Sequence, residues 1–411
     1  MRTPLDSPFS PGSDTVPQVW AGRTAQLSDW HDILRPRRLA GIPERGRTIL
    51  GEAGTGKSSL VRRIADEAAA AGDWVTPQLR IPSGADPIKR VAAALLDLAD
   101  TAGLAVAREQ RIAALLGQVQ SVAVSGLSLG LRGRSEGAEP YTALTELLVE
   151  IGRAAIRAGD VMVVIHLDEA QNLGHPDALS QLLVALGDAL THEEPLEVPG
   201  GLQIRRALPI AVYLTGLPEF AEMAGSGTGA TFARRFQTSV LGAIDDTAIR
   251  AALQPFLTRG WPVGDGGRVF MEPAAQAAII ALACGEPFLF QLAGERAWYA
   301  GTGDLITAAD VHTGWQSAAP EAEAHVQRIL DRLPRREQQF IQTMAELAPE
   351  ERNLTAIAQR MGYSKTTDAG PTARRLDITR GLIHRGKPYR FAHRAVEAHL
   401  TTEWPWNPAA I

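Results

Sequence analysis

The sequence has almost no cysteine, little lysine and no long apolar run. Its 411 residues include one cysteine, Cys284, which excludes an internal disulfide and a cysteine-based zinc cluster. Such usage is typical of a reducing compartment, and we expect a cytoplasmic protein. The most apolar long stretch, 112–131, is interrupted by glutamine, serine and glycine, so no membrane partner is expected. Residues 1–16, rich in proline and serine, predict a disordered tail instead of a signal peptide.

Charge is distributed unevenly along the chain. The formal net charge is −5, from 41 Lys+Arg and 46 Asp+Glu. Residues 325–411 hold 14 basic and 9 acidic side chains, whereas residues 1–324 hold 27 and 37. A basic end on an acidic body indicates an appended nucleic-acid-binding module. Only four of the basic residues are lysines, so the abundance of arginine is partly a bias of composition. Each single arginine is therefore weaker evidence for a nucleic-acid-binding surface.

Apolar runs alternate with amphipathic stretches between residues 48 and 240. The run at 161–165 does not alternate, which is typical of a central strand covered on both faces. The pattern predicts an α/β fold with a doubly wound parallel sheet. Expected strands are 48–50, 74–81, 161–165 and 210–214, and expected helices are 60–71, 88–98, 141–158 and 178–190. Two short alternating runs in 121–131 predict a surface hairpin or insert, and 192–206 is a polar excursion.

Beyond residue 241 the strand signals stop. Helical spacing at 247–256, 273–283, 287–300 and 308–316 predicts a helical bundle. The last 85 or so residues predict helices at 334–347, 354–361 and 371–381, followed by two short strands within 382–391. These have the proportions of a winged helix-turn-helix. We therefore expect a core at 17–240, a helical lid at 241–320 and a winged helix at 325–411.

Residues 51–58 fit the phosphate-binding pattern G-x-x-x-x-G-K-[ST], with a strand before the loop and a helix after it. Backbone N–H groups of such a loop wrap a phosphate, and the helix N-terminus adds its positive dipole end. Lys57 would reach the β- and γ-phosphates and Ser58 would bind Mg²⁺. The expected cofactors are thus ATP and Mg²⁺, with ADP as product. The expected nucleotide-binding residues in the loop are Glu52, Ala53, Gly54, Thr55, Gly56, Lys57, Ser58 and Ser59.

A pair of acids ends the buried run at 161–167, where doubly wound folds bind ligands. Asp168 would hold Mg²⁺ through water, and Glu169 would orient and deprotonate the attacking water. Gln171 could touch the γ-phosphate or that water. A guanine-reading N-K-x-D sequence is absent, which favours ATP over GTP.

Two further positions have alternative interpretations. Thr215 ends an apolar run and could sense the γ-phosphate, or it could be only a turn residue before Gly216. Arg234 and Arg235 lie near the end of the α/β region, where one could reach a neighbouring subunit's nucleotide as an arginine finger. They could equally be solvated surface side chains.

The predicted helix-turn-helix carries a set of cations. Lys365, Arg374, Arg375 and Arg380 could meet DNA phosphates or guanine edges, and Lys387 would lie on the wing. This favours double-stranded DNA as a partner. The alternative is a packing arm that contacts a protein partner or the rest of the chain.

Together these motifs resemble AAA+ ATPases, and among them the initiator-like bacterial ATPases related to origin-recognition proteins and STAND signalling NTPases. The likeness extends over nearly everything after residue 16. It is carried by 21–23 (AGR), 51–58 (GEAGTGKS), 168–171 (DEAQ), 214–218 (LTGLP), 233–236 (ARRF) and 285–288 (GEPF). Initiators usually place an arginine shortly after the G-x-P of the lid. Here Phe288, Leu289, Phe290 and Gln291 follow, and Arg296 is the nearest substitute.

The resemblance implies Walker A, Walker B, sensor 1 and arginine-finger roles for the residues above, and it places Gly22 and Arg23 near the adenine. It implies an ATPase that assembles into homo-oligomers, with an arginine finger completing each site in trans, and whose nucleotide state controls DNA binding through the winged helix. The alternatives are a STAND-like signalling switch or scaffold without DNA contact, and a transcription regulator whose ATPase domain only senses a ligand.

Overall fold

The structure is a computed structural model that describes residues 2–12, 15–82, 85–102, 140–159, 161–172, 176–198, 202–225, 234–264 and 266–407. The insert predicted at 121–131 lies outside these residues. The chain forms two compact units. We call residues Thr24–Leu50 and Leu60–Val240 the sheet unit, and Met1–Arg23, Gly51–Ser59 and Leu241–Ile411 the helical unit. The phosphate-binding loop thus groups with the C-terminal half. The predicted domain boundaries stay predictions.

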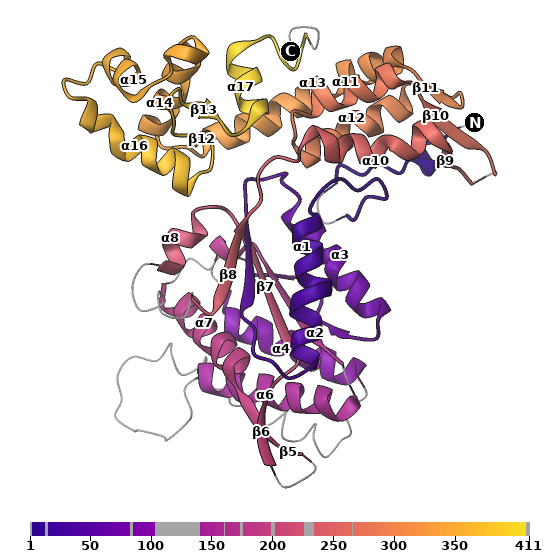
Figure 1. Ribbon diagram of the computed structural model, residues 1–411, viewed down its shortest axis with the longest axis vertical. Helices are drawn as coiled ribbons and strands as arrows, with labels where there is room; N and C mark the ends of the chain where they lie inside the picture. Colours follow the sequence, from indigo (N-terminus) through magenta and orange to yellow (C-terminus); the bar gives the residue numbers. More distant parts are fainter. Residues whose placement is uncertain are drawn as a thin grey trace. The chain divides into compact units, whose positions relative to one another are not determined.

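The sheet unit is built on a six-stranded parallel sheet, which confirms the predicted α/β class (Figure 1). The strand order is β2-β4-β7-β1-β8, and β3 also pairs with β4. The strands are β1 (Gly46–Leu50), β2 (Trp74–Val75), β3 (Leu79–Arg80), β4 (Val163–Asp168), β7 (Ile210–Gly216) and β8 (Phe236–Val240). Every residue of β4 is buried, as its lack of alternation predicts.

The strand expected at 74–81 is divided in two. Trp74 of β2 pairs with Val163, and Leu79 of β3 pairs with Leu167. Residues 74–79 therefore lie opposite residues 163–167 of β4, a stretch that is one residue shorter. An extra residue on one side interrupts pairing in the manner of a bulge.

Helices cover both faces of the sheet. Val212 and Leu214 pack in the core shared with α4, α6 and α7, whereas Tyr213 points to the opposite face and contacts Trp30. Alternation along β7 therefore separates two layers. The helices are α1 (Thr24–Ser28), continued by a π-helical turn at 29–34 into α2 (Arg35–Leu39), then α3 (Lys57–Ala70), α4 (Pro87–Thr101), α6 (Pro140–Ala158), α7 (Pro176–Thr191) and α8 (Phe220–Gly225).

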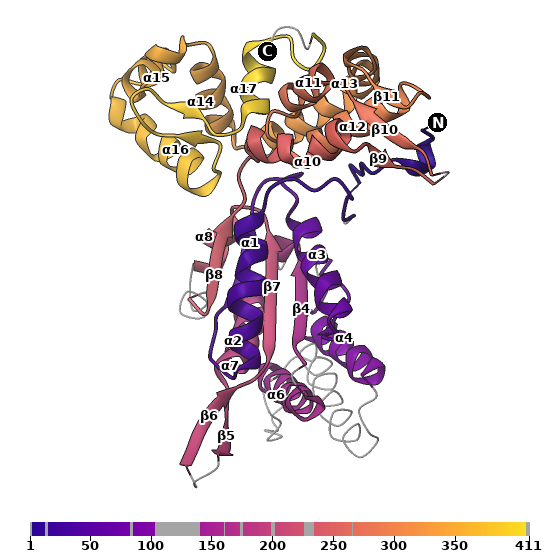
Figure 2. The ribbon, with the colours of Figure 1, turned by 45° about the vertical axis from the view of Figure 1, so that its right-hand side comes forward.

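The excursion expected at 192–206 is instead an antiparallel ribbon of β5 (Glu193–Val198) and β6 (Leu202–Ala207). Figure 2 shows it extending away from the parallel sheet. Glu194 lies opposite Arg206 and Leu196 opposite Ile204. Opposite charges and paired aliphatic side chains across the ribbon stabilise the two strands. The proline and glycine residues in this stretch favour a loop in the sequence pattern, so the strands were not predicted.

Within the described residues of 241–331, the helical unit has the expected helices and also three short strands that the sequence did not predict. The helices are α10 (Asp246–Thr258), α11 (Pro273–Ala283), α12 (Pro287–Tyr299) and α13 (Ala308–Asp331). The strands β9 (Trp261–Pro262), β10 (Arg268–Met271) and β11 (Leu305–Ile306) form one sheet. Each strand has too few residues to give a clear period of two. Helix α13 continues past the expected end at residue 316 and includes Pro320.

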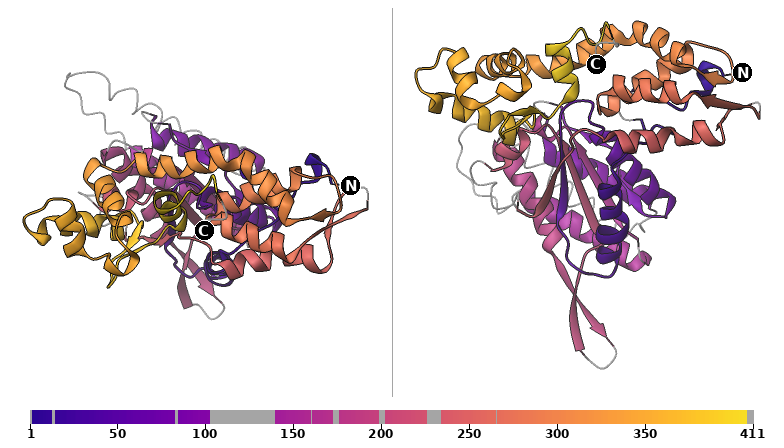
Figure 3. Two further views of the ribbon diagram at one scale, coloured as in Figure 1. Left: turned by 90° about the horizontal axis from the view of Figure 1, so that it is seen from above. Right: turned by 45° about the horizontal axis from the view of Figure 1, so that its top comes forward.

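The C-terminal segment of this unit follows α13 directly, as the two views of Figure 3 show in orange and yellow. It contains α14 (Arg335–Ala345), α15 (Leu354–Arg360), α16 (Gly370–Arg374) with a π-helical turn at 375–379, the antiparallel pair β12 (Ile383–His384) and β13 (Arg390–Phe391), and α17 (Arg394–Thr401). Its apolar side chains join those of α10 to α13 in one core. The winged-helix interpretation stays a prediction.

The N-terminal residues differ from the disordered tail expected at 1–16. Arg2 and Phe9 are 2% and 3% exposed. The ring of Phe9 stacks on Phe256 with centroids 5.7 Å apart, and Gly294 leaves it room because a Cβ there would overlap the ring. Aromatic burial therefore fixes a segment whose composition alone indicates disorder. Among the described residues, no helix is long and apolar enough to cross a membrane.

If this segment is part of the core, Phe9→Ala should lower the free energy of unfolding of the helical unit by about 3 kcal/mol, since it removes a fully buried ring. Leu5→Ala is the matched control, because Leu5 is 97% exposed. Chemical denaturation monitored by tryptophan fluorescence measures both variants. Equal stability of the two would contradict the packing of Phe9.

Candidate functional site

The phosphate-binding loop joins β1 to α3 and folds back on itself. Gly54 and Gly56 have φ of +80° and +81°, a conformation that side chains other than glycine rarely adopt. A Cβ at Gly54 would also overlap Cε1 of His325 in α13. The Nζ atom of Lys57 donates hydrogen bonds to the carbonyl oxygens of Gly51 and Glu52, at 2.8 and 2.7 Å. The loop thus holds its ammonium group in place.

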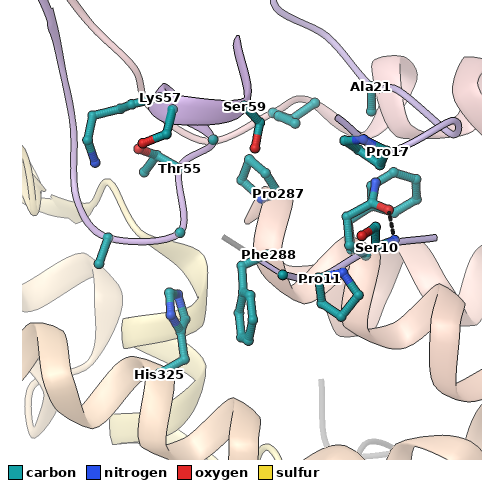
Figure 4. Close-up of a pocket in the computed structure, with 18 of the residues that line it drawn as sticks. Ser10, Pro11, Pro17, Ala21, Thr55, Lys57, Ser59, Pro287, Phe288 and His325 are labelled. Atoms are coloured by element: carbon teal, nitrogen blue, oxygen red, sulfur yellow. Dashed lines mark hydrogen bonds between the residues drawn. The ribbon is translucent and has the colours of Figure 1, made fainter. Parts of the chain in front are cut away.

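A cavity of about 470 Å³ opens beside this loop, within the helical unit. Its size is in the range of small-molecule sites. Figure 4 shows Lys57 and Thr55 at one end, Ser10, Pro11 and Pro17 at the other. The loop residues that the sequence predicts to bind nucleotide and that line this cavity are Ala53, Gly54, Thr55, Gly56, Lys57, Ser58 and Ser59. A cationic end beside the glycine loop and an apolar end fit the phosphates and the base of a nucleotide.

Arg23 ties the segment before α1 to the loop. Its Nη2 atom donates to the carbonyl oxygens of Thr55 and Gly242, both at 2.8 Å. Burial lowers the pKa of Arg23 to about 10, although the charge of Glu286 opposes the shift. Arg23 lines the cavity, whereas the predicted Gly22 packs against Ile244 instead.

Glu52 is the one predicted loop residue among positions 52–59 that does not line the cavity. Its side chain is buried and its Oε2 atom lies 2.6 Å from Nη2 of Arg332. Arg332 caps the C-terminus of α13, where the C-terminal segment begins. The loop is therefore joined to that segment by an ion pair. Sequence reasoning missed Arg332, because no motif spacing relates it to the loop.

A second buried ion pair joins the start of α12 to the residue before α17. Nδ1 of His393 lies 2.7 Å from Oε1 of Glu286. Burial alone would lower the pKa of His393, but attraction and the hydrogen bond from Glu286 outweigh burial and raise it. Burial would likewise raise the pKa of Glu286, yet the charge and hydrogen bond of His393 lower it. The pair is thus held in its charged form.

His325 of α13 lies beside the phosphate-binding loop, next to Gly54. Burial lowers its pKa to about 4, so the ring is neutral at pH 7. The ring packs against Phe288 with centroids 4.8 Å apart, and both side chains line the cavity.

In the sheet unit, the predicted Asp168 and Thr215 come together. Neighbouring strands β4 and β7 end side by side, and the hydroxyl of Thr215 donates a hydrogen bond to Oδ1 of Asp168. Oδ2 of Asp168 accepts from Nε2 of Gln78 at 2.5 Å, and Nε of Arg80 lies 3.7 Å away. Gln78 and Arg80 carry no motif and were missed.

The other predicted residues at this sheet edge differ in exposure. Glu169 is exposed, has a φ of +56°, and its Oε2 accepts from Nδ2 of Asn172 at 2.9 Å. A positive φ in a non-glycine residue directly after a buried strand is typical of a functional position. Gln171 turns inward, where its Oε1 accepts from the backbone N–H of Leu217 at 3.1 Å.

The predicted arginines separate into two kinds. Arg235 forms an ion pair with Asp188 of α7 and packs over Gly187, whereas Arg234 is exposed. Arg296, the substitute for a lid arginine, pairs with Glu321 at 3.3 Å and does not line the cavity.

The predicted DNA-binding cations also differ. Lys365, Arg374, Arg375 and Lys387 are exposed. Arg380 is only 6% exposed, and its Nε lies 3.1 Å from Oε2 of Glu337 in α14. Its placement on a DNA-facing surface is therefore corrected: it is a buried structural arginine. Arg375 also pairs with Glu337, at 3.2 Å.

Comparison with known proteins agrees with this architecture. Residues 19–198 match the AAA ATPase domain family. Among solved structures, the fold is similar to that of the Aeropyrum pernix ORC2 protein in ADPNP–ADP complexes, with a TM-score of 0.56, 14% identity, and 95% of each chain covered. It is also similar to a Walker-type ATPase of Pyrococcus abyssi, with a TM-score of 0.55, 14% identity, and 93% of this chain and 96% of that one covered. A comparison with curated proteins by sequence finds no match.

The pair of His393 and Glu286 predicts a pH-dependent stability. A raised pKa of His393 stabilises the helical unit below the ordinary value of 6.5, and this stabilisation is lost as pH rises through the raised pKa. A lowered pKa of Glu286 acts in the opposite sense and its contribution is lost as pH falls below 4.5. In His393→Gln the decline above pH 6.5 should disappear, while the exposed His384→Gln should keep it. Chemical denaturation at a series of pH values measures the slopes, and parallel slopes in wild type and His393→Gln would contradict the assignment.

Proposed function

We propose that the chain, whose residues 19–198 match the AAA ATPase domain family, is a P-loop ATPase whose nucleotide state controls DNA binding by the C-terminal segment and assembly into oligomers. The observation that carries this proposal is the ion pair between Glu52 of the loop and Arg332 at the end of α13. A change in the loop would reach the C-terminal segment through this direct contact of buried Glu52 with Arg332.

Nucleotide binding is assigned to the cavity beside the loop. Lys57 would hold the β- and γ-phosphates, and the hydroxyl of Ser58 would ligate Mg²⁺. The ammonium group of Lys57 must exchange its two carbonyl acceptors for phosphate oxygens, which favours a rearranged loop in the bound state. Bound Mg²⁺ would neutralise charge that develops on the phosphates.

Hydrolysis is assigned to the side chains at the sheet edge. Glu169 is exposed and would accept the proton of the attacking water, while Asp168 would hold the metal through water. Thr215 binds Asp168 and so would fix the orientation of its carboxylate. Gln171 is occupied by Leu217 and would act by positioning the end of β7.

An arginine finger in a homo-oligomer is assigned to Arg234 before Arg235. Arg234 is exposed, whereas Arg235 is already paired with Asp188. An exposed guanidinium can reach a partner's γ-phosphate, and a paired one must first break an ion pair.

DNA binding is assigned to Lys365, Arg374 and Arg375 around α16, and to Lys387 near β13. All four are exposed. Their charges would contact the backbone phosphates of double-stranded DNA and release counterions.

The second candidate function is a signalling switch or scaffold that binds a protein instead of DNA. The burial of Arg380 and the pairing of Arg375 with Glu337 favour it, because both reduce the positive charge offered to DNA.

Two substitutions separate binding from hydrolysis. Glu169→Gln should keep ATP binding and lower turnover by at least about 100-fold, because the general base is lost. Lys57→Ala should lose both binding and turnover. Calorimetric titration and phosphate release measure the two steps. Unchanged turnover in Glu169→Gln would remove the residue from its assigned role.

The control of DNA binding is tested on the C-terminal segment. The double variant Lys365→Ala/Arg374→Ala should weaken DNA binding and reduce the slope of log K against log salt by about 2, one for each phosphate contact. Arg259→Ala, which removes an exposed charge from α10's C-terminus, should change neither. In Arg332→Met, ATP should no longer change DNA affinity.

Fluorescence anisotropy with and without ATP gives these quantities, and mass measurement gives the oligomeric state. An absence of salt-dependent DNA binding in the wild type would leave the protein-binding switch as the function. Retained ATP control in Arg332→Met would show that the pair with Glu52 does not transmit the signal.

A further inference from the structure

The N-terminal segment, residues 2–12, is held firmly on the helical unit at its start. Arg2 donates hydrogen bonds to the carbonyl oxygens of Gly301 and Leu305 at 2.7 and 2.8 Å, and to the carboxylate of Asp310 at 2.9 Å. The carbonyl oxygen of Thr3 accepts from Nε1 of Trp298 at 2.7 Å. Three charge-assisted bonds from one buried guanidinium are a strong anchor.

The other end of the segment is held by Gln291 of α12. Its Oε1 atom accepts from the backbone N–H of Ser10 at 3.0 Å, and its Nε2 atom donates to the carbonyl oxygen of Val19 at 2.8 Å. The side chain is only 6% exposed. One buried amide thus fixes two chain positions nine residues apart, Ser10 and Val19.

Between these anchors the segment reaches the cavity beside the phosphate-binding loop. Ser10, Pro11 and Gly12 line it, and Figure 4 shows Ser10 and Pro11 at the end away from Lys57. Figure 4 shows Pro17 and Ala21 on the same side of the cavity, and its lining also includes the apolar side chains of Ile244, Pro287 and Phe290. The backbone N–H groups of the loop and the side chain of Lys57 are suited to bind phosphates, whereas apolar side chains are suited to pack against the flat face of a base.

We propose that residues 10–12, held by Gln291, form the wall against which the base of the bound nucleotide packs. Gln291 is a positioning residue, because its amide oxygen and its amide nitrogen each hydrogen-bond to the backbone of the N-terminal chain. Arg2 acts at a greater distance by fixing the start of the same segment. The inference rests on the proposed binding of ATP in this cavity.

The test compares a ligand that has a base with one that lacks it. Mg²⁺ with ATP, and Mg²⁺ with inorganic tripolyphosphate, are titrated calorimetrically into wild type, Gln291→Met and Arg2→Met. Both variants should bind ATP about tenfold more weakly, since two wall-fixing hydrogen bonds or the segment's anchor are lost. Their affinity for tripolyphosphate should stay within about twofold of wild type.

The matched control is Gln276→Met in α11, which removes a hydrogen bond of similar burial to the carbonyl oxygen of Arg250 but lies outside the cavity. It should change neither affinity. An equal loss of affinity for ATP and tripolyphosphate, or an unchanged affinity for ATP in both variants, would contradict the proposal that residues 10–12 contact the base. Should Gln291→Met fail to fold, Arg2→Met alone decides, because Arg2 does not line the cavity.

Failure of the proposed function gives a different result. In that case wild type binds neither ligand, or Lys57→Ala binds both as well as wild type does. A wild type that binds ATP and tripolyphosphate with similar affinity would show that the site gains nothing from the base, and would overturn the inference alone.

Discussion

The charged contact between Glu52 and Arg332 is the direct link between the phosphate-binding loop and the end of α13. Removing Arg332 would leave the buried carboxylate of Glu52 without its counter-charge, so the two side chains hold the loop and the end of α13 together. The pair of Glu286 and His393 does the same for the start of α12 and the residue before α17. Each pair connects the C-terminal segment with an element that lines the cavity beside the loop or directly precedes residues that do. Their low exposure means that salt screens them less than surface pairs.

Local patterns predicted the parallel sheet and the helices around it. The parallel sheet follows from apolar runs such as 161–165, and the loop follows from its glycines, because a phosphate-binding loop needs both a left-handed backbone and a positive end of a helix. Asp168 and Thr215 meet because neighbouring parallel strands end at one edge. Each of these inferences uses residues close in sequence or a rule of sheet topology.

What the sequence could not predict depends on distant residues. The order of residues 2–12 comes from contacts with residues more than 300 positions away, such as those of Arg2 with Leu305 and Asp310, which composition does not reveal. The burial of Arg380 depends on Glu337 in another helix. Strands of two to four residues, such as β9, β10 and β11, are too short for a periodic signal and form only because a neighbouring strand is present. Tertiary context thus overrides local propensity at these places.

The division of the chain into its two units is discontinuous: the backbone passes between them after residues 23, 50, 59 and 240. Neither unit is one uninterrupted stretch of polypeptide, so neither can be excised by cutting the gene at a single junction. A truncation at residue 240 would keep the glycine loop but discard Gly242, Phe288, His325 and Arg332, the side chains and carbonyl that surround it. Such a fragment would contain every residue of the phosphate-binding motif but none of the contacts from residues 242–332 that hold the loop in its conformation.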